Sequence, residues 1–245
     1  MIAHTVRRLL AWLGGHGHLF IAAVLAVVAG TWGFVKLLDE VKEGETQHFD
    51  EWVIRTLRQH EGPPWLQEVG RDFTALGGVA VMVLVTLAVA GYLLLRRMYG
   101  AMWLVLIATT GGLVLSTVLK YFIDRARPSI VEHRSVVYTS SFPSGHSMMS
   151  AVVYLTLGSL LARIMPGRVL KVYFLLLAMG LTFLVGVSRV YLGVHWPTDV
   201  LAGWCGGLVW ALLCWLVARQ LQRRGTVEKD EALLGADEHG FDVKL

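Results

Sequence analysis

The sequence predicts an all-α integral membrane protein: a bundle of six transmembrane helices with an interfacial helical segment between the first two. Of its 245 residues, 55% are hydrophobic and only 16% are charged, whereas a soluble domain carries about 25% charged residues. Six apolar stretches approach the roughly 20 residues that a helix needs to cross the hydrocarbon core. This composition excludes a disordered chain and a basic nucleic-acid-binding arm, so we expect no nucleic-acid partner.

Each predicted span is continuously apolar rather than alternating, which favours helices over strands. The spans are 19–35, 73–95, 98–119, 147–162, 172–188 and 200–218. Arg7 and Arg8 before the first span also resemble the start of a signal peptide, but the apolar stretch that follows is too long for one. Cys205 and Cys214 are too far apart along one helix to form a disulfide.

The distribution of lysine and arginine predicts the orientation in the membrane. One face of the predicted bundle carries ten basic residues and no acidic ones, whereas segment 36–72 on the other face has five basic and nine acidic residues. The positive-inside rule therefore predicts a multi-pass protein with both termini in the cytoplasm and segments 39–72, 120–146 and 189–199 outside. We expect residues 1–224 to form one six-span domain and the polar tail, 225–245, to be disordered.

Segment 39–72 contains apolar residues at helical spacing. Phe49, Trp52, Val53 and Leu57 recur on one face and are interleaved with charged residues, and the pattern stops at residues 62–64, Gly-Pro-Pro. An amphipathic helix lying in the membrane interface fits this pattern. A loop packed against the bundle is the alternative that the sequence leaves open.

Three polar clusters lie at the outer ends of the last four predicted spans, and the predicted topology brings them to one side of the membrane. They comprise residues 120–128, 143–146 and 188–199. Lys120, Arg127 and Arg189 supply cations, two of them guanidinium groups suited to phosphate oxygens. Excess positive charge on the face that the positive-inside rule disfavours indicates an anionic ligand.

The second and third clusters add a helix terminus and a histidine–carboxylate pair. Ser144 precedes an apolar run and is a predicted N-cap, so the amides of Gly145 and His146 would open a helix that can bind an anion. His195 and Asp199 are four residues apart, a spacing at which the carboxylate can accept from one imidazole nitrogen. Such a pair is typical of an oriented nucleophile.

Together, K-x6-RP, PSGH and SR-x5-H-x3-D resemble the motifs of the type 2 phosphatidic acid phosphatase superfamily, and residues 120–199 match all three in order. The resemblance implies a metal-independent phosphatase without a cofactor, acting on a phosphomonoester or a pyrophosphate. It implies that His195 attacks phosphorus to form a phosphohistidine, that Asp199 holds its ring, and that His146 protonates the leaving oxygen and then activates water. The implied phosphoryl ligands are Lys120, Arg127, Ser144, Gly145 and Arg189.

The substrate is the least defined part of this hypothesis. Phosphatidate, phosphatidylglycerol phosphate and undecaprenyl diphosphate all present a phosphate at the outer headgroup level of a bacterial cytoplasmic membrane, where we expect the active site. A lipid phosphotransferase would use the same residues, a non-catalytic phospholipid transporter would not need the His195–Asp199 pair, and a glucose-6-phosphatase-like activity on a soluble ester stays open. Six spans argue against the soluble vanadate haloperoxidases of the superfamily. The sequence does not specify an oligomeric state.

Overall fold

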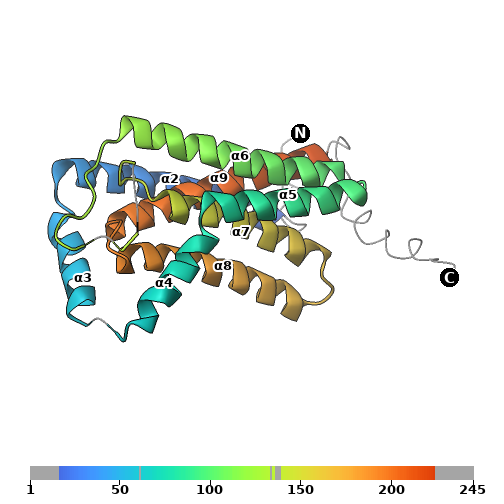
Figure 1. Ribbon diagram of the computed structural model, residues 1–245. Helices are drawn as coiled ribbons and strands as arrows, with labels where there is room; N and C mark the ends of the chain where they lie inside the picture. Colours follow the sequence, from blue (N-terminus) through green and yellow to red (C-terminus); the bar gives the residue numbers. More distant parts are fainter. Residues whose placement is uncertain (1–16, 61, 133, 136–138, 224–245) are drawn as a thin grey trace, which may run out of the picture.

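The computed structural model describes residues 17–223 except 61, 133 and 136–138, and the regular structure in this part is helical throughout (Figure 1). The helices are α2 (His18–Glu43), α3 (Gln47–Gln59), α4 (Trp65–Leu76), α5 (Val79–Leu95), α6 (Tyr99–Phe122), α7 (Gly145–Ile164), α8 (Arg168–Tyr191) and α9 (Pro197–Arg223). Arg7, Arg8 and the tail 225–245 lie outside the described residues, so the predictions made for them remain predictions.

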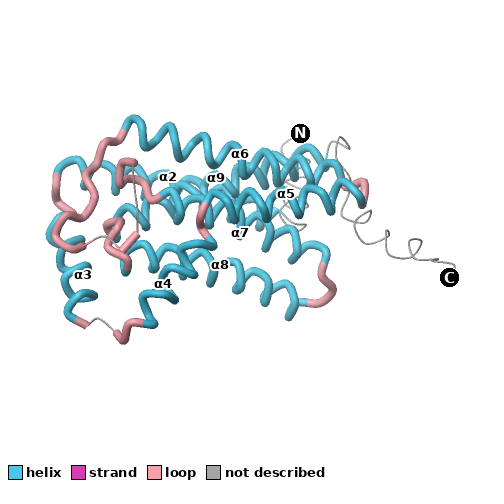
Figure 2. Tube along the Cα trace, viewed as in Figure 1, coloured by secondary structure: helices cyan, strands magenta, loops and turns pink. Residues whose placement is uncertain are grey.

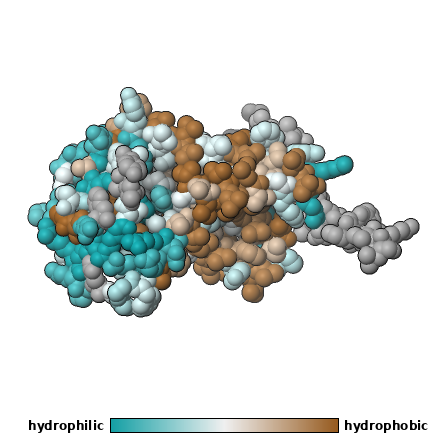
Figure 3. All heavy atoms as spheres, in the orientation of Figure 1, coloured by the Kyte–Doolittle hydropathy of each residue, from teal (hydrophilic) through white to brown (hydrophobic). Residues whose placement is uncertain are grey.

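The helices form the predicted membrane bundle. Five of them, α2, α6, α7, α8 and α9, are long and apolar enough to cross a membrane, and α4 with α5 makes a sixth, bent candidate. Hydrophilic residues gather at the end of the molecule that carries α3, and hydrophobic residues cover the part beyond it (Figure 3). The all-α membrane fold with an additional helical segment after the first span is therefore confirmed.

The second span differs from the prediction because it is not one straight helix over 73–95. Helix α4 ends at Leu76, α5 begins at Val79, and their axes differ by 47°. Gly77 and Gly78 form the break, where the extended backbone of Gly78 ends the helical path. A side chain at Gly77 would collide with Val185 of α8 and crowd His146 of α7. The break thus lets the chain pass close to the start of α7.

Helix α7 lies at the centre of the bundle, packed against α5, α6, α8 and α9. Glycine permits its closest approach to α9, because a Cβ added at Gly207 would lie 2.5 Å from the carbonyl oxygen of Met148 and 2.7 Å from the Cβ of Ala151. Small residues at membrane helix contacts allow this distance. Cys205 and Cys214 are both free thiols, as predicted.

In segment 39–72, residues 39–43 continue α2, and the rest contains α3 and most of α4. Helix α3 covers the end of the bundle. Ile54 of α3 is fully buried against Val190, Trp196 and Val200, with Val53 and Leu57 packed beside it. Of the predicted apolar stripe, Phe49 and Trp52 stay exposed. The two sequence interpretations therefore each hold in part: the segment is helical and amphipathic, and one face of α3 packs on α8 and α9.

Candidate active site

The three predicted clusters come together at the end of the bundle that carries α3. They occupy the connection between α6 and α7, the first turn of α7, the end of α8 and the connection into α9, and these loops gather at the same end (Figure 2). The opposite end holds the α5–α6 and α7–α8 turns. The clusters are thus side by side, although up to 79 positions separate their outermost residues, Lys120 and Asp199.

The first turn of α7 is formed by a serine cap. Ser144 has an extended backbone and is fully buried, and its hydroxyl accepts from the backbone N–H and the hydroxyl of Ser147 at 3.4 and 2.9 Å. The amides of Gly145 and His146 precede the first intrahelical bond, which runs from Met148 N to Ser144 O. Such first-turn amides lack helical partners and favour an anion.

Lys120, Arg127 and Arg189 are the cations that act electrostatically on His146 in the first turn of this helix. Lys120 Nζ donates to Ser140 O at 2.7 Å, Arg127 Nε to Thr139 O at 2.8 Å, and Arg189 Nη1 to Thr74 Oγ1 at 3.0 Å. In the described part of the chain, none of the three is in an ion pair. Arg189 is buried, and Lys120 and Arg127 are half-buried. Cations withdrawn from water are normally paired, so three that meet only neutral acceptors among the described residues are suited to bind an anion.

Two details connect these cations to the helix terminus. A Cβ at position 145 would lie 3.3 Å from Lys120 Cε, so glycine leaves space for the lysine stem to cross the start of α7. Arg189 is 2% exposed, and its Nε has no hydrogen-bond partner among the described residues. An unsatisfied buried donor is costly, and an anion bound beside the helix terminus would satisfy it.

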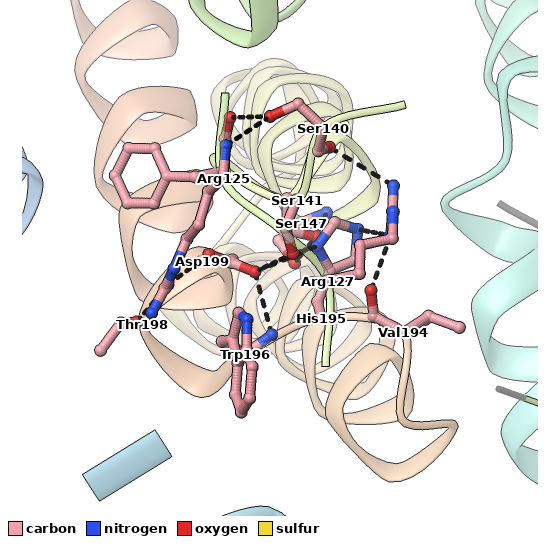
Figure 4. Close-up of polar contacts among 12 residues, drawn as sticks. Arg125, Arg127, Ser140, Ser141, Ser147, Val194, His195, Trp196, Thr198 and Asp199 are labelled. Atoms are coloured by element: carbon pink, nitrogen blue, oxygen red, sulfur yellow. Dashed lines mark hydrogen bonds and ion pairs between the residues drawn. The ribbon is translucent and has the colours of Figure 1, made fainter. Parts of the chain in front are cut away.

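His195 lies between the carboxylate of Asp199 and the guanidinium of Arg127 (Figure 4). Its Nδ1 lies 3.4 Å from Asp199 Oδ2, and its Nε2 lies 3.2 Å from Arg127 Nη1. Asp199 lies in the first turn of α9, and two hydrogen bonds hold its side chain. Its Oδ2 accepts from Trp196 N–H at 2.9 Å and from Ser141 Oγ at 2.5 Å. With the proton on Nδ1, the Nε2 lone pair faces Arg127 Nη1.

The His195 ring is 1% exposed, and this burial decides its charge. Desolvation lowers the pKa of His195 to about 3, and the hydrogen bond to Asp199 opposes this shift. The ring is therefore neutral at physiological pH and retains a lone pair. Burial also lowers the pKa of Arg127, with Asp199 acting in the opposite direction.

His146 opens α7 beside the other predicted residues. It lies within electrostatic range of His195, Arg189, Lys120 and Arg127, and its Cβ would be 3.3 Å from a Cβ at Gly77. Its ring makes no hydrogen bond to another described side chain. All eight predicted site residues thus belong to one cluster.

Sequence reasoning missed the residues that support Asp199 from behind. Arg125 donates from Nη1 to Asp199 Oδ1 at 2.6 Å and from Nη2 to Asp50 Oδ2 at 2.7 Å. Asp50, fully buried on α3, also accepts from Thr198 N at 3.0 Å. Arg125 lies within the predicted cluster 120–128 but was not among its predicted site residues. Asp50 precedes Ile54 by four residues, so both lie on the same face of α3. This spacing is the one sequence signal that connects Asp50 to the buried face of the helix.

Two hydroxyl groups were missed as well. Ser141 precedes the PSGH motif by two residues and donates to Asp199, and Thr74, near the end of α4, accepts from Arg189. No spacing rule connects either residue to its partner, because each contact joins separate helices or loops. Their roles follow only from the tertiary structure.

The described helices form a bundle with five membrane-spanning candidates and a sixth, bent one, and one end of this bundle gathers a helix N-terminus, a histidine–aspartate pair and three cations that form no ion pair with a described residue. The model of the PAP2 superfamily matches residues 100–223. The chain belongs to this superfamily, whose membrane members include lipid phosphatases.

Individual relatives extend the likeness beyond the motifs. The chain is 38% identical over 184 residues to phosphatidylglycerophosphatase B of Bacillus subtilis, covering 72% of this chain and 86% of the relative. It is 32% identical over 134 residues to undecaprenyl-diphosphatase of Sulfolobus acidocaldarius, covering 51% and 57% respectively. The crystal structure of a transmembrane PAP2-type phosphatidylglycerolphosphate phosphatase from Bacillus subtilis superposes with a TM-score of 0.75 and 30% identity, covering 80% of this chain and 98% of that one.

Proposed function

We propose that this protein hydrolyses a phosphomonoester or pyrophosphate of a membrane lipid on the extracytoplasmic side of the cell membrane, through a phosphohistidine on His195. One observation carries the proposal: Lys120, Arg127 and Arg189 converge without an ion pair in the described structure beside a neutral, carboxylate-held histidine. A phosphoryl group would supply the negative charge that balances these cations. Bound there, it would lie within reach of the Nε2 lone pair.

The proposed reaction has two displacements at phosphorus. In the first, His195 Nε2 forms a bond to phosphorus while the bond to the leaving oxygen breaks, and His146 gives that oxygen a proton. In the second, His146 removes a proton from water, the water oxygen bonds to phosphorus, and the bond to Nε2 breaks. Asp199 stabilises the positive charge that His195 acquires, and the three cations stabilise the charge on the phosphoryl oxygens.

The proposal requires no metal ion, and the donor set supports this. Among the described residues, no group of three or more histidine, cysteine, aspartate or glutamate side chains is placed to hold one. The two buried carboxylates nearest the site, Asp50 and Asp199, both contact the guanidinium of Arg125. The guanidinium of Arg125 therefore supplies the positive charge that a metal ion would bring to these two carboxylates. We expect activity to survive excess chelator and to be blocked by vanadate.

The location of the site supports a lipid substrate. Tyr121 and Phe122, directly after Lys120, are exposed, as are Trp52 of α3 and Trp65 of α4. Tryptophan and tyrosine side chains concentrate at headgroup depth, where a lipid phosphate already lies. Burial of acyl chains would add about 0.8 kcal/mol per methylene to substrate binding, so we expect long-chain lipids to be preferred over soluble esters.

Phosphate release by the purified protein in detergent with chelator tests the activity and the substrate together. The panel comprises phosphatidate, phosphatidylglycerol phosphate, undecaprenyl diphosphate, glycerol phosphate and glucose 6-phosphate. We expect kcat/KM to be orders of magnitude higher for one or more of the lipids. Equal values for the soluble esters would remove the lipid substrate, and activity that chelator abolishes and magnesium restores would remove the metal-free mechanism.

Acid-quenched protein tests the nucleophile. His195→Ala is expected to abolish both turnover and the acid-labile phosphoenzyme, whereas the exposed control His48→Ala retains both. His146→Ala is expected still to form the phosphoenzyme from p-nitrophenyl phosphate, because this leaving group needs little protonation, but to hydrolyse it slowly, because the attacking water then lacks its base. Phosphate trapped on His146 in the unmodified protein would reverse the two roles.

A further inference from the structure

A second group of charges meets Asp199 at Oδ1, whereas His195 lies near the other carboxylate oxygen, Oδ2. Arg125 is held between two carboxylates, with Nη2 2.7 Å from Asp50 Oδ2 and Nη1 2.6 Å from Asp199 Oδ1. The side chains of Asp50 and Asp199 are fully buried, and the side chain of Arg125 is 12% exposed. Asp50 is 149 positions from Asp199 in the sequence, so α3 brings to the site a charge that no motif of α6–α9 contains.

This group holds one positive charge, on Arg125, and two negative charges, on Asp50 and Asp199. If Arg125 faced Asp199 alone, the two would form a neutral pair, and Asp199 would have little charge left to stabilise a positive His195. Asp50 supplies the second negative charge, so the three groups together carry one net negative charge. In a buried environment such a charge acts strongly on a neighbouring imidazole, because solvent screens it little.

Asp50 also holds the backbone at the start of α9. Thr198 donates to Asp50 through its backbone N–H at 3.0 Å and through its hydroxyl at 2.6 Å. Thr198 is the second residue of α9, where the N–H has no helical partner, so a carboxylate from another helix takes the place of a local cap. The residue fixed in this way directly precedes Asp199. Asp50 therefore constrains both the position of Asp199 and the charge that Asp199 presents.

We propose that Asp50 is a positioning residue for the nucleophile, acting through Arg125 and Thr198 on Asp199. The inference rests on the proposed function, since it assigns Asp50 to the support of an attacking His195. It makes α3, which lies outside the motif region, a working part of the active site.

The test uses full-length protein in detergent with a lipid substrate from the panel above. Asp50→Asn keeps the shape and one acceptor for Thr198 but removes the charge. We expect kcat and the single-turnover rate of phosphoenzyme formation to fall about 10- to 100-fold, the scale of a displaced reactive group, while KM changes less than about twofold. Glu51→Gln, which loses a surface pair with Arg55 on the same helix, is the matched control and should behave as the unmodified protein.

A double variant separates charge from structure. In Asp50→Asn/Arg125→Gln the unbalanced guanidinium is gone, so Asp199 recovers its net charge and kcat should rise above that of Asp50→Asn. A purely structural contact predicts that the second substitution adds to the loss. Elution volume and unfolding midpoint show whether each variant folds. If Asp50→Asn does not, Asp50→Glu, which keeps the charge but displaces it by one methylene, replaces it and is expected to lower kcat.

The outcomes distinguish this inference from the proposed function. The role of Asp50 would be overturned by an unchanged kcat in the tested Asp50 variant, or by a double variant no more active than Asp50→Asn. Phosphate trapped on His195 in the unmodified protein would still support the proposed phosphatase mechanism. Phosphate trapped on a residue other than His195 in the unmodified protein would overturn both.

Discussion

Arg125 and Arg127 are two positions apart in the sequence, yet their side chains have opposite electrostatic surroundings. Arg125 contacts two buried carboxylates, whereas Arg127 contacts carbonyl oxygens, a hydroxyl and the imidazole of His195. The first arginine is therefore compensated within the protein, and the second keeps a charge for a ligand. This difference separates a residue that supports Asp199 from one that we propose to bind the phosphoryl group.

The buried, neutral His195 makes stability depend on pH. Its folded-state pKa of about 3 lies below the ordinary value of about 6.5. Below pH 6.5 the unfolded chain therefore binds a proton that the folded protein does not, and the free energy of unfolding falls as the pH falls through the window from 6.5 to about 3. At pH 5 this contribution is about 2 kcal/mol, and above pH 6.5 it vanishes.

Unfolding in detergent at pH 7.5 and pH 5.0 measures this effect. We expect the loss of stability on acidification to be smaller in His195→Gln than in the unmodified protein, because the glutamine does not titrate. His48→Gln, at an exposed position of α3, is the control and should retain the full loss. An equal loss in His195→Gln and the unmodified protein would contradict the buried, neutral state of His195.

At the scale of helices, close approach at small residues determines where the site residues end up. Gly207 lets α9 lie against the first turns of α7, next to the Ser144 cap, and the Gly77–Gly78 break lets α4 reach Arg189 through Thr74. These glycines contribute no side chain to the site. They set the distances between the helices that carry those groups.

Gly207→Ala is expected to destabilise the protein by about 1–3 kcal/mol, the usual cost of overpacking. The added methyl would lie 2.5 Å from the carbonyl oxygen of Met148, and α7 and α9 must separate to admit it. Gly180→Ala on α8, where no atom lies within 4 Å of the added carbon, is the matched control. Its unfolding midpoint should stay unchanged or rise, because alanine favours helix over glycine. Equal midpoints for the two variants would show that the α7–α9 contact tolerates the methyl.

At the scale of the whole molecule, charge and apolar surface are separated along the bundle axis. The site, α3 and α4 lie at the hydrophilic end, and the α5–α6 and α7–α8 turns with their basic residues lie at the other (Figures 1 and 3). Arg96 and Arg97 lie in the α5–α6 turn, and Arg168 and Lys171 lie in the first turn of α8, directly after the α7–α8 turn. Under the positive-inside rule, we propose that these turns face the cytoplasm and that the site faces outward.

Labelling with a membrane-impermeant thiol reagent in intact cells tests this orientation. In a background with Cys205→Ala and Cys214→Ala, Glu45→Cys should be labelled from outside, and Pro166→Cys should be labelled only after the cells are opened. Both positions are exposed in the turns at opposite ends of the bundle, so access of the reagent is comparable. Labelling of Pro166→Cys alone in intact cells would invert the proposed topology.

Most of the fold was predictable because a membrane span must satisfy its backbone within one helix. The apolar length of each segment therefore predicted the helices, and five of the six spans need no revision. The break at Gly77–Gly78 was not predictable, since an apolar run of 23 residues over 73–95 has the same composition whether it is straight or bent. At the break, Gly77 lies against Val185 and His146, which belong to other helices.

The sequence by itself determined the membrane class, the helices and the candidate site residues from 120 to 199, because local spacing and charge are sufficient for these. The tertiary structure alone decided which charges are balanced. Asp50 reaches Arg125 and Thr198 across 75 and 148 positions, and Thr74 reaches Arg189 across 115. Interactions of this range depend on how the helices pack, and no periodicity within one segment encodes them.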